Sequence, residues 1–243
     1  DEIIINNQNS QNYLNYSNIK GPSETKASDV YRITKITGDI IVEIKTVKRD
    51  SNGEYKFTTY YGDKEYQFFV TGAEGTFEAV MENNIVNIIC SVNTEVTLSG
   101  ILYGSIVVAN NETIDMEINL SNCTIISDKN CPILVEISDD VDISAKLGTE
   151  NFIYDNREYS EEFTGAIYTN CDLKMKGNGT LTIVSKNNNG IHSKDDLTLQ
   201  KLTLYIECED NAIKGNDSVT IESGIYTLIA RTGDGIKTNN SGL

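Results

Sequence analysis

A repeat of 22 to 24 residues in the second half of the chain constrains the fold more than any other feature. Each repeat carries an isoleucine preceded by Gly or Ala, and successive isoleucines stand 24, 22 and 23 residues apart. These isoleucines are Ile167, Ile191, Ile213 and Ile236. After the first three comes a pair of apolar residues in alternate positions, such as Leu173 and Met175. Alternation of this kind is typical of a β-strand with one buried face, so each repeat contains at least one strand.

A period of this length without helical periodicity predicts a right-handed parallel β-helix, in which equivalent residues of successive turns stack. A leucine-rich repeat has a similar period, but it requires an asparagine ladder beside LxxLxL and usually a helix. Less regular alternating segments before residue 163 predict earlier turns, with a loop inserted at residues 156–163. We expect the all-β helix to occupy residues 85–243.

The first third of the chain has a different sequence pattern, without the repeat. Residues 1–28 are rich in asparagine and predict an arm or linker. Residues 29–84 contain an alternating run at residues 40–44, then Asn52-Gly53, and this pattern predicts an N-terminal antiparallel β region.

The last repeat is short, because the sequence stops at Leu243 where a further inward strand is due after Ile236. An open end of a β-helix exposes apolar stacking surface and unpaired strand edges. We therefore expect either that the chain is a fragment of a longer protein, or that its N-terminal region or another chain covers this end.

The charge of the chain excludes two classes of partner. With 36 acidic and 20 basic residues the formal net charge is −16, which repels nucleic acid phosphates and anionic lipid headgroups. No apolar run approaches the roughly 18 residues that a membrane-spanning helix needs, so we expect no membrane insertion. The single histidine, His192, gives little support to a Ser-His-Asp site or a multi-histidine metal site, and we expect it in a surface turn.

The five cysteines are too widely spread for a zinc cluster or a disulfide-dense scaffold. Cys123 and Cys131 are near enough in sequence to flank one turn and pair in an oxidising compartment. The alternative of five inert thiols is favoured, because unpaired cysteine is a common core residue.

Oxygen-bearing side chains recur on both sides of the repeated isoleucines, and stacking would bring them within about 4.8 Å of one another. Carboxylates at that spacing destabilise each other unless a proton or cation lies between them, and Ca²⁺ is held by six to eight such oxygens. The sequence therefore predicts calcium in the turns. The alternative is that these residues are ordinary turn formers that hydrogen-bond their own backbone.

The repeat resembles a known family of carbohydrate-binding β-helix proteins of the cell surface that are related to pectate lyases. The resemblance rests on GAIYTNCDLKMKGNGTLTIVS, NGIHSKDDLTL, DNAIKGNDSVTI and GDGIKT, with GTENFIYDN upstream. It implies a secreted or cell-surface protein that binds cellulose and pectin of the plant cell wall, with Ca²⁺ in its acidic turns and no established catalysis. By position it points to the following metal ligands, with asparagine replacing the family's aspartate at the last two: Asp195, Asp196, Asp210, Asp217, Asp234, Asn189 and Asn211.

Tyrosine is the residue expected to stack on sugar rings, because the chain contains 13 tyrosines and no tryptophan. Candidates in the antiparallel region are Tyr60, Tyr61 and Tyr66. On the repeat the candidate carbohydrate contacts are Tyr168, Tyr205 and Tyr226, together with Lys214 and Lys237 for acidic sugars.

Two alternatives to a non-catalytic binding module stay open. A calcium-dependent polysaccharide lyase would need a deprotonated base, and Lys214 and Lys237 are the candidates. Carboxylates beside them are expected to raise their pKa, which opposes that role. A docking module that presents its stacked edges to another protein of a surface scaffold is the second alternative.

Overall fold

The computed structural model describes residues 3–6, 12–14, 30–33, 46–48 and 53–239. The chain divides into two units, Asp1–Ser51 and Asn52–Leu243. The described strands of the first unit form two antiparallel pairs, β1 (Ile3–Asn6) with β3 (Val30–Ile33) and β2 (Asn12–Leu14) with β4 (Thr46–Lys48). Most of the predicted arm at residues 1–28, and the alternating run at residues 40–44, lie outside the described residues.

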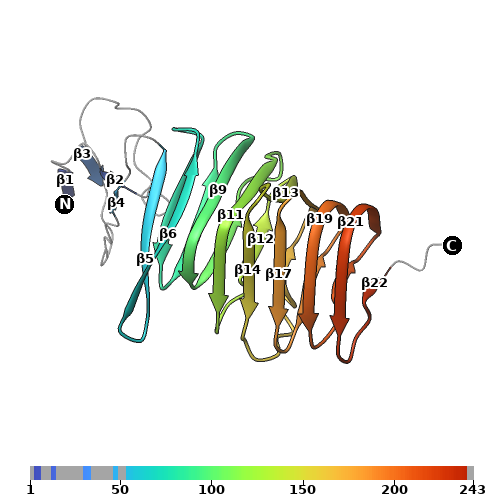
Figure 1. Ribbon diagram of the computed structural model, residues 1–243. Helices are drawn as coiled ribbons and strands as arrows, with labels where there is room; N and C mark the ends of the chain where they lie inside the picture. The colour runs from blue at the N-terminus through green and yellow to red at the C-terminus, as the bar shows by residue number, and fades with distance from the viewer. Residues whose placement is uncertain (1–2, 7–11, 15–29, 34–45, 49–52, 240–243) are drawn as a thin grey trace. The chain divides into compact units, whose positions relative to one another are not determined.

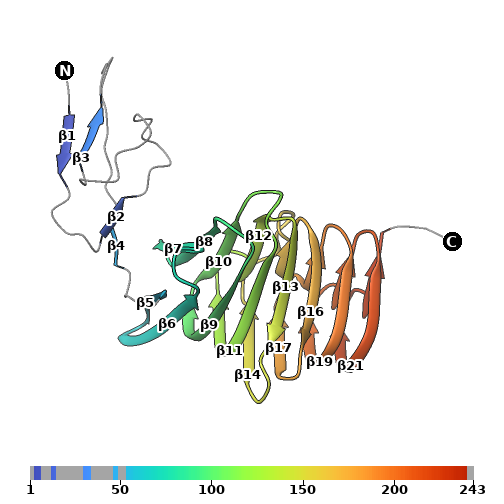
Figure 2. The ribbon, with the colours of Figure 1, turned by 90° about the horizontal axis from the view of Figure 1, so that it is seen from above.

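The second unit begins with antiparallel strands and continues as a parallel β-helix. β5 (Glu54–Tyr61) and β6 (Lys64–Gly72) form a hairpin, and β7 (Phe77–Glu82) is antiparallel to the strand that follows it. From that strand onward every pairing between successive turns is parallel, and Figures 1 and 2 show the turns stacked one behind the next. The prediction of a parallel β-helix with an antiparallel β region before it is confirmed.

The first face of the helix is a sheet of eight strands, in which one short parallel strand comes from each turn. In the described part of the chain these parallel strands give seven turns. They are β8 (Ile85–Cys90), β10 (Ser105–Ala109), β12 (Ile133–Ile137), β15 (Gly165–Thr169), β18 (Asn189–Ser193), β20 (Ile213–Gly215) and β22 (Ile236–Thr238).

Long bent strands connect the second and third faces. The second face contains β13 (Asp140–Ala145) and β16 (Asp172–Gly177), and the third contains β14 (Glu150–Asp155) and β17 (Thr180–Ser185). In the other turns one strand spans both faces, and these strands are β9 (Thr94–Tyr103), β11 (Met116–Ser127), β19 (Leu197–Cys208) and β21 (Val219–Ala230).

The bend in each long strand falls on a residue with a left-handed backbone. The φ angles are 85° at Gly100, 51° at Asn122, 58° at Lys201 and 139° at Gly224. Glycine and asparagine adopt this conformation at low cost, whereas lysine does so less readily. These residues therefore set the corner between the second and third faces.

The core is a stack of aliphatic columns. In the first face Ile167, Ile191, Ile213 and Ile236 are register partners in successive turns, as the repeat predicts. The first three are fully buried, whereas Ile236 in the last described turn is 45% exposed. The segments predicted as earlier turns join the same stack, since Ile118 pairs with both Val96 and Ile143. The repeated isoleucines therefore hold the turns together through apolar burial.

All five cysteines are unpaired and buried. Burial raises the pKa of Cys131 and Cys171 to about 12, and that of Cys90 and Cys208 to about 11. A thiol with so high a pKa carries almost no thiolate at neutral pH, so these side chains act as core residues. The described residues also contain no helix long and apolar enough to cross a membrane.

Candidate functional site

The insert between β14 and β15 covers part of the outward side of the first face. Phe163 of this insert packs edge-on against Tyr168, with 5.5 Å between ring centroids, and Cys131 and Leu134 lie in the same cluster. As a result the side chain of Tyr168, a predicted carbohydrate contact, is only 6% exposed.

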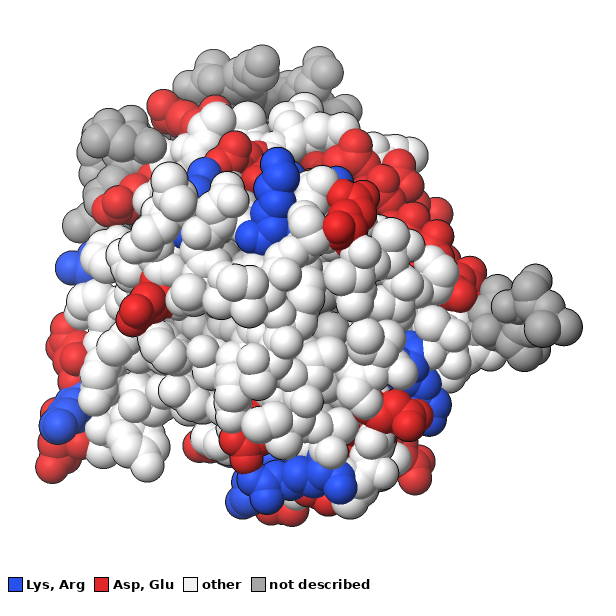
Figure 3. All heavy atoms as spheres, turned by 45° about the vertical axis from the view of Figure 1, so that its right-hand side comes forward, with Lys and Arg blue, Asp and Glu red and all other residues white. Residues whose placement is uncertain are grey.

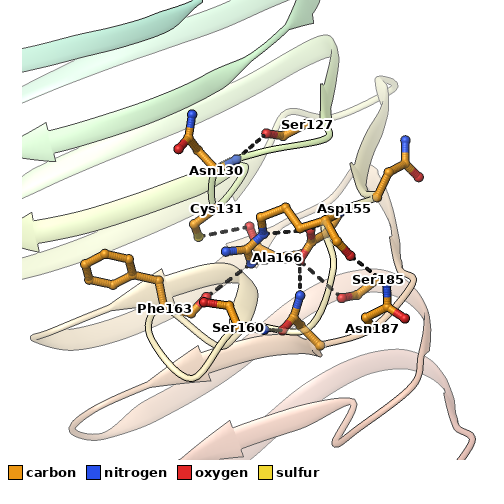
Figure 4. Close-up of polar contacts among 12 residues, drawn as sticks. Ser127, Asn130, Cys131, Asp155, Ser160, Phe163, Ala166, Ser185 and Asn187 are labelled. Atoms are coloured by element: carbon orange, nitrogen blue, oxygen red, sulfur yellow. Dashed lines mark hydrogen bonds and ion pairs between the residues drawn. The ribbon is translucent and has the colours of Figure 1, made fainter.

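A buried ion pair holds the insert in place (Figure 4). Nε and Nη2 of Arg157 donate to the two carboxylate oxygens of Asp155, each over 2.8 Å. Nη2 also donates to the carbonyl oxygens of Phe163 and Gly165, and Ser185 donates to the carboxylate from the next turn. Burial alone would lower the pKa of Arg157, but its bonds to Asp155 outweigh burial and raise it. The guanidinium therefore stays charged where it lies.

A column of polar side chains continues from Tyr168 along the outward side of the first face. His192, Lys214 and Lys237 follow in register in the next three turns. His192 is 5% exposed, with Nδ1 2.7 Å from the Thr164 hydroxyl and Nε2 3.1 Å from Oδ1 of Asn216. The expectation of a surface turn is wrong for this residue, because the insert covers it.

The pKa of Lys214 shifts in the direction opposite to the expectation. Burial, followed by the charge of Lys237, lowers the pKa of Lys214, although the carboxylate of Asp210 acts in the opposite direction. The carboxylates beside Lys214 in the sequence predict a raised pKa, but stacking also places Lys237 beside it in the next turn. Lys237 lies 3.9 Å from Asp234, and both side chains are well exposed.

An acidic corner lies between the first and second faces. It contains three of the predicted metal ligands, Asp195, Asp196 and Asp217. Asp140 and Asp172 are register partners, and the amide of Asp196 donates to Oδ1 of Asp172 over 2.9 Å. The amide of Asp217 donates to the carbonyl of Asp195 over 3.4 Å. Burial first, and then the neighbouring carboxylates, raise the pKa of Asp140 and of Asp195. Figure 3 shows acidic side chains in a band along one edge of the molecule.

The other predicted metal ligands lie at the opposite end of the first-face strands, in a hydrogen-bonded ladder. Nδ2 of Asn211 donates to Oδ1 of Asn189 over 2.8 Å and to Oδ1 of Asp210 over 2.9 Å. Oδ1 of Asn211 accepts from the amide of Asp234 over 2.9 Å. Both asparagines are almost fully buried. Their amide oxygens are thus engaged inside the fold, and the seven predicted ligands are divided between two separate corners.

No ready-made metal cage is formed by these groups. Within the described residues, no three side chains of His, Cys, Asp or Glu are gathered as a metal site. Any cation at the acidic corner would have to draw on backbone carbonyl oxygens or water as well as carboxylates, which calcium accepts.

Aromatic residues alternate with buried residues on three strands of the third face, β9, β14 and β19, which are labelled in Figure 1. Tyr103 on β9, Phe152 and Tyr154 on β14, and Tyr205 on β19 are all half-buried. The rings of Phe152 and Tyr154 are parallel within 1° at 6.3 Å between centroids. Tyr103 stacks on Tyr61 at 4.7 Å. We call these four residues of the helix the aromatic track.

Only one of the predicted carbohydrate contacts belongs to the aromatic track, and this is Tyr205. Tyr226 is the register partner of the inward residue Leu204, and its hydroxyl donates to the carbonyl of Ser223. The sequence analysis missed Phe152 and Tyr154, although they flank the buried Ile153 in an alternating run that marks both as outward-facing.

Comparison with known proteins is consistent with this fold. A curated "carbohydrate-binding domain-containing protein" from Acetivibrio thermocellus is 32% identical over 102 residues, which are 40% of this chain and 36% of that protein. The chain thus spans about a third of that relative's length. A solved structure described as the polysaccharide lyase-like protein from C. thermocellum, gadolinium derivative, is similar with a TM-score of 0.64 and 27% identity, over 76% of this chain and 74% of that one.

A family model matches most of the β-helix. It covers residues 82–242, which is about two thirds of the chain, and it describes the carbohydrate-binding domain-containing proteins. With its stacked turns and its outward aromatic face, the chain belongs to the family of carbohydrate-binding domain-containing proteins.

Proposed function

We propose that this chain is a non-catalytic module that binds cellulose and pectin of the plant cell wall, secreted or at the cell surface. The observation that carries the proposal is the aromatic track on the third face, with half-buried rings at Tyr103, Phe152, Tyr154 and Tyr205. Aromatic rings held partly open to solvent on a flat, rigid sheet offer apolar faces to sugar rings at little entropic cost. Membership of a carbohydrate-binding family supports the same ligand class.

We further propose that calcium binds the acidic corner and stabilises the fold. The donors there are of the right chemistry, because carboxylates from successive turns lie near one another, and burial first and then these neighbours raise the pKa of Asp195 and of Asp140. Asp195, Asp196 and Asp217 would hold the ion. Asp210 and Asp234 would form a second site of lower affinity, since Asn189 and Asn211 beside them are already hydrogen-bonded in the buried ladder.

Retention on insoluble polysaccharide tests the binding function. The protein is mixed with cellulose and with a pectate gel, each with calcium or with excess chelator, and the unbound protein is measured. We expect retention on at least one of the two supports, and weaker retention after chelation. Failure on both supports with folded, calcium-loaded protein would refute the proposal and favour docking to a protein partner of a surface scaffold.

A calcium-dependent polysaccharide lyase is the second candidate, and one observation favours it. The pKa of Lys214 is lowered by burial and by Lys237, which is the direction that a lysine base requires. Incubation of the calcium-loaded protein with polygalacturonate, followed by measurement of unsaturated products, separates the two functions. The binding proposal predicts no product above a Lys214→Met control.

A further inference from the structure

We propose that the third face binds a single extended chain of a neutral, cellulose-type glucan that lies across the strands, with every second sugar resting on the aromatic track. This inference rests on the proposed function, because it names the face and the ligand class through which polysaccharide binding occurs. It is carried by the spacing of the rings, by the side chains between them and by the local charge.

The rings recur on every second strand of the third face. Its strands lie in the order β9, β11, β14, β17, β19, and the track has rings on the first, third and fifth of these. Neighbouring strands are about 4.8 Å apart, so successive ring positions are about 9.6 Å apart. An extended β-linked glucan turns each sugar over relative to the last and repeats its orientation with every disaccharide, over a similar length. Each ring position would therefore meet the same face of every second sugar.

The strands between the ring positions carry smaller side chains in the same columns. One column runs Tyr103, Ile126, Tyr154 in register, and the next runs Phe152, Thr182, Tyr205. An isoleucine or threonine projects less far than an aromatic ring, so a chain crossing these strands would touch the rings and pass over the positions between them. The column positions between the rings bear no charge.

Within the two columns of the track from β9 to β19, the charged side chain is that of Glu207, and the exposed Lys186 and Lys201 lie outside these columns. Tyr205 donates from its hydroxyl to Oε2 of Glu207 over 3.2 Å, and Arg231 is already paired with that same carboxylate. Glu150 lies exposed at the start of β14. Carboxylates on the protein would repel a chain of uronates, whereas the hydroxyls of a neutral sugar can donate hydrogen bonds to them. The face thus favours a neutral glucan over pectate.

Calorimetric titration with cello-oligosaccharides of increasing length tests this arrangement on the intact, calcium-loaded protein. We expect affinity to rise with length until the ligand spans from β9 to β19, about 19 Å over four strand spacings, and to level off beyond. Phe152→Ala, Tyr154→Ala and Tyr205→Ala should each weaken binding about three- to tenfold. Tyr159→Ala is the matched control, because Tyr159 is 66% exposed on the insert and outside the track.

A second type of variant keeps every ring in place. Val184 lies on β17, between Tyr154 of β14 and Glu207 of β19 in the same column. Val184→Lys puts a long charged side chain at this position. It should also weaken binding, while the melting temperature stays close to that of the wild type. If the wild type binds no polysaccharide at all, the proposed function itself fails. If it binds cello-oligosaccharides but the track variants bind as tightly as Tyr159→Ala, only the track is refuted. Equal affinity for oligogalacturonate of the same length would overturn the preference for a neutral chain.

Discussion

Arg157 and Asp155 form a bidentate ion pair, with both hydrogen bonds at 2.8 Å and both side chains buried. The pair joins the end of β14 to the insert that covers Tyr168 and His192. An uncompensated charge at this depth is costly, so the pair fixes the path of the insert across the first face.

Removal of the Arg157 side chain should therefore destabilise the fold strongly. We expect Arg157→Ala to lower the free energy of unfolding by about 3–5 kcal/mol, because it leaves the carboxylate of Asp155 buried without its partner. Arg231→Ala is the control, since Arg231 pairs with Glu207 at an exposed site and should contribute only about 0–1 kcal/mol. Urea denaturation of both variants measures the difference. Similar losses in the two variants would contradict the structural role given to the insert.

Calcium and charge removal should each stabilise the acidic corner, and charge removal should reduce the effect of calcium. Saturating calcium is expected to raise the melting temperature of the wild type by several degrees, because the proposed ion would bind the folded turns and not the unfolded chain. Asp195→Asn should melt about 1–2 °C higher than the wild type in chelator, since it removes a half-buried charge that burial and the neighbouring carboxylates disfavour, yet it should gain less from calcium. Thermal melts of both proteins with and without calcium check this. A calcium shift of the same size in the variant would remove Asp195 from the site.

The asparagine ladder should contribute to the stability of the fold rather than to metal binding. Asn211→Ala removes the buried donor to Asn189 and the partly buried acceptor of the Asp234 amide, and should lower the free energy of unfolding by about 2–3 kcal/mol. Asn239→Ala removes one exposed hydrogen bond to Asn216 and should stay within about 0.5 kcal/mol. Urea denaturation in the presence of chelator measures both losses without any contribution from calcium. A loss for Asn211→Ala that appears only when calcium is present would instead identify it as a ligand.

The buried His192 should make the protein sensitive to acid. Its pKa is lowered to about 4 by burial, whereas the unfolded chain has the ordinary value near 6.5, so the unfolded state binds more protons between these values. Stability from this group is therefore complete above about pH 6.5 and falls as the pH drops toward 4, by at most about 3 kcal/mol.

A matched variant separates this effect from the carboxylates. The raised pKa values of Asp140 and Asp195 act in the opposite direction, because those groups gain a proton in the folded state first and lose their repulsion as the pH falls. The difference in unfolding free energy between wild type and His192→Gln, measured from pH 7 to pH 4, isolates the histidine. A difference that does not change with pH would rule out this account of His192.

The stacking of the turns could be predicted from the sequence because it rests on a periodic, local signal. Each inward isoleucine must occupy the same place in its turn, so subtraction of residue numbers reveals the register that pairs Ile167 with Ile191 and Ile191 with Ile213. The covering of the first face could not be predicted in this way. It depends on how the insert folds back, and this placed Tyr168 and His192 in the interior although their positions in the repeat face outward.

The aromatic track was difficult to predict for a related reason. Its rings come from strands two turns apart, and the inserted loop breaks the regular spacing between Tyr154 on one side and Tyr205 on the other. Only the register of β14, β17 and β19 brings them into neighbouring columns. The direction of the Lys214 pKa shift failed to emerge from the sequence because the neighbour that matters most after burial, Lys237, is 23 residues away along the chain and one turn away in space.

Polysaccharide binding without cleavage is tested most directly by an adsorption isotherm on insoluble cellulose in calcium, with unbound protein and released sugar measured in the same supernatants. We expect adsorption that saturates with protein concentration, competition by cello-oligosaccharides, and no sugar released over time. Adsorption that neither saturates nor yields to the competitor, or a steady release of sugar by the wild-type protein, would contradict the account.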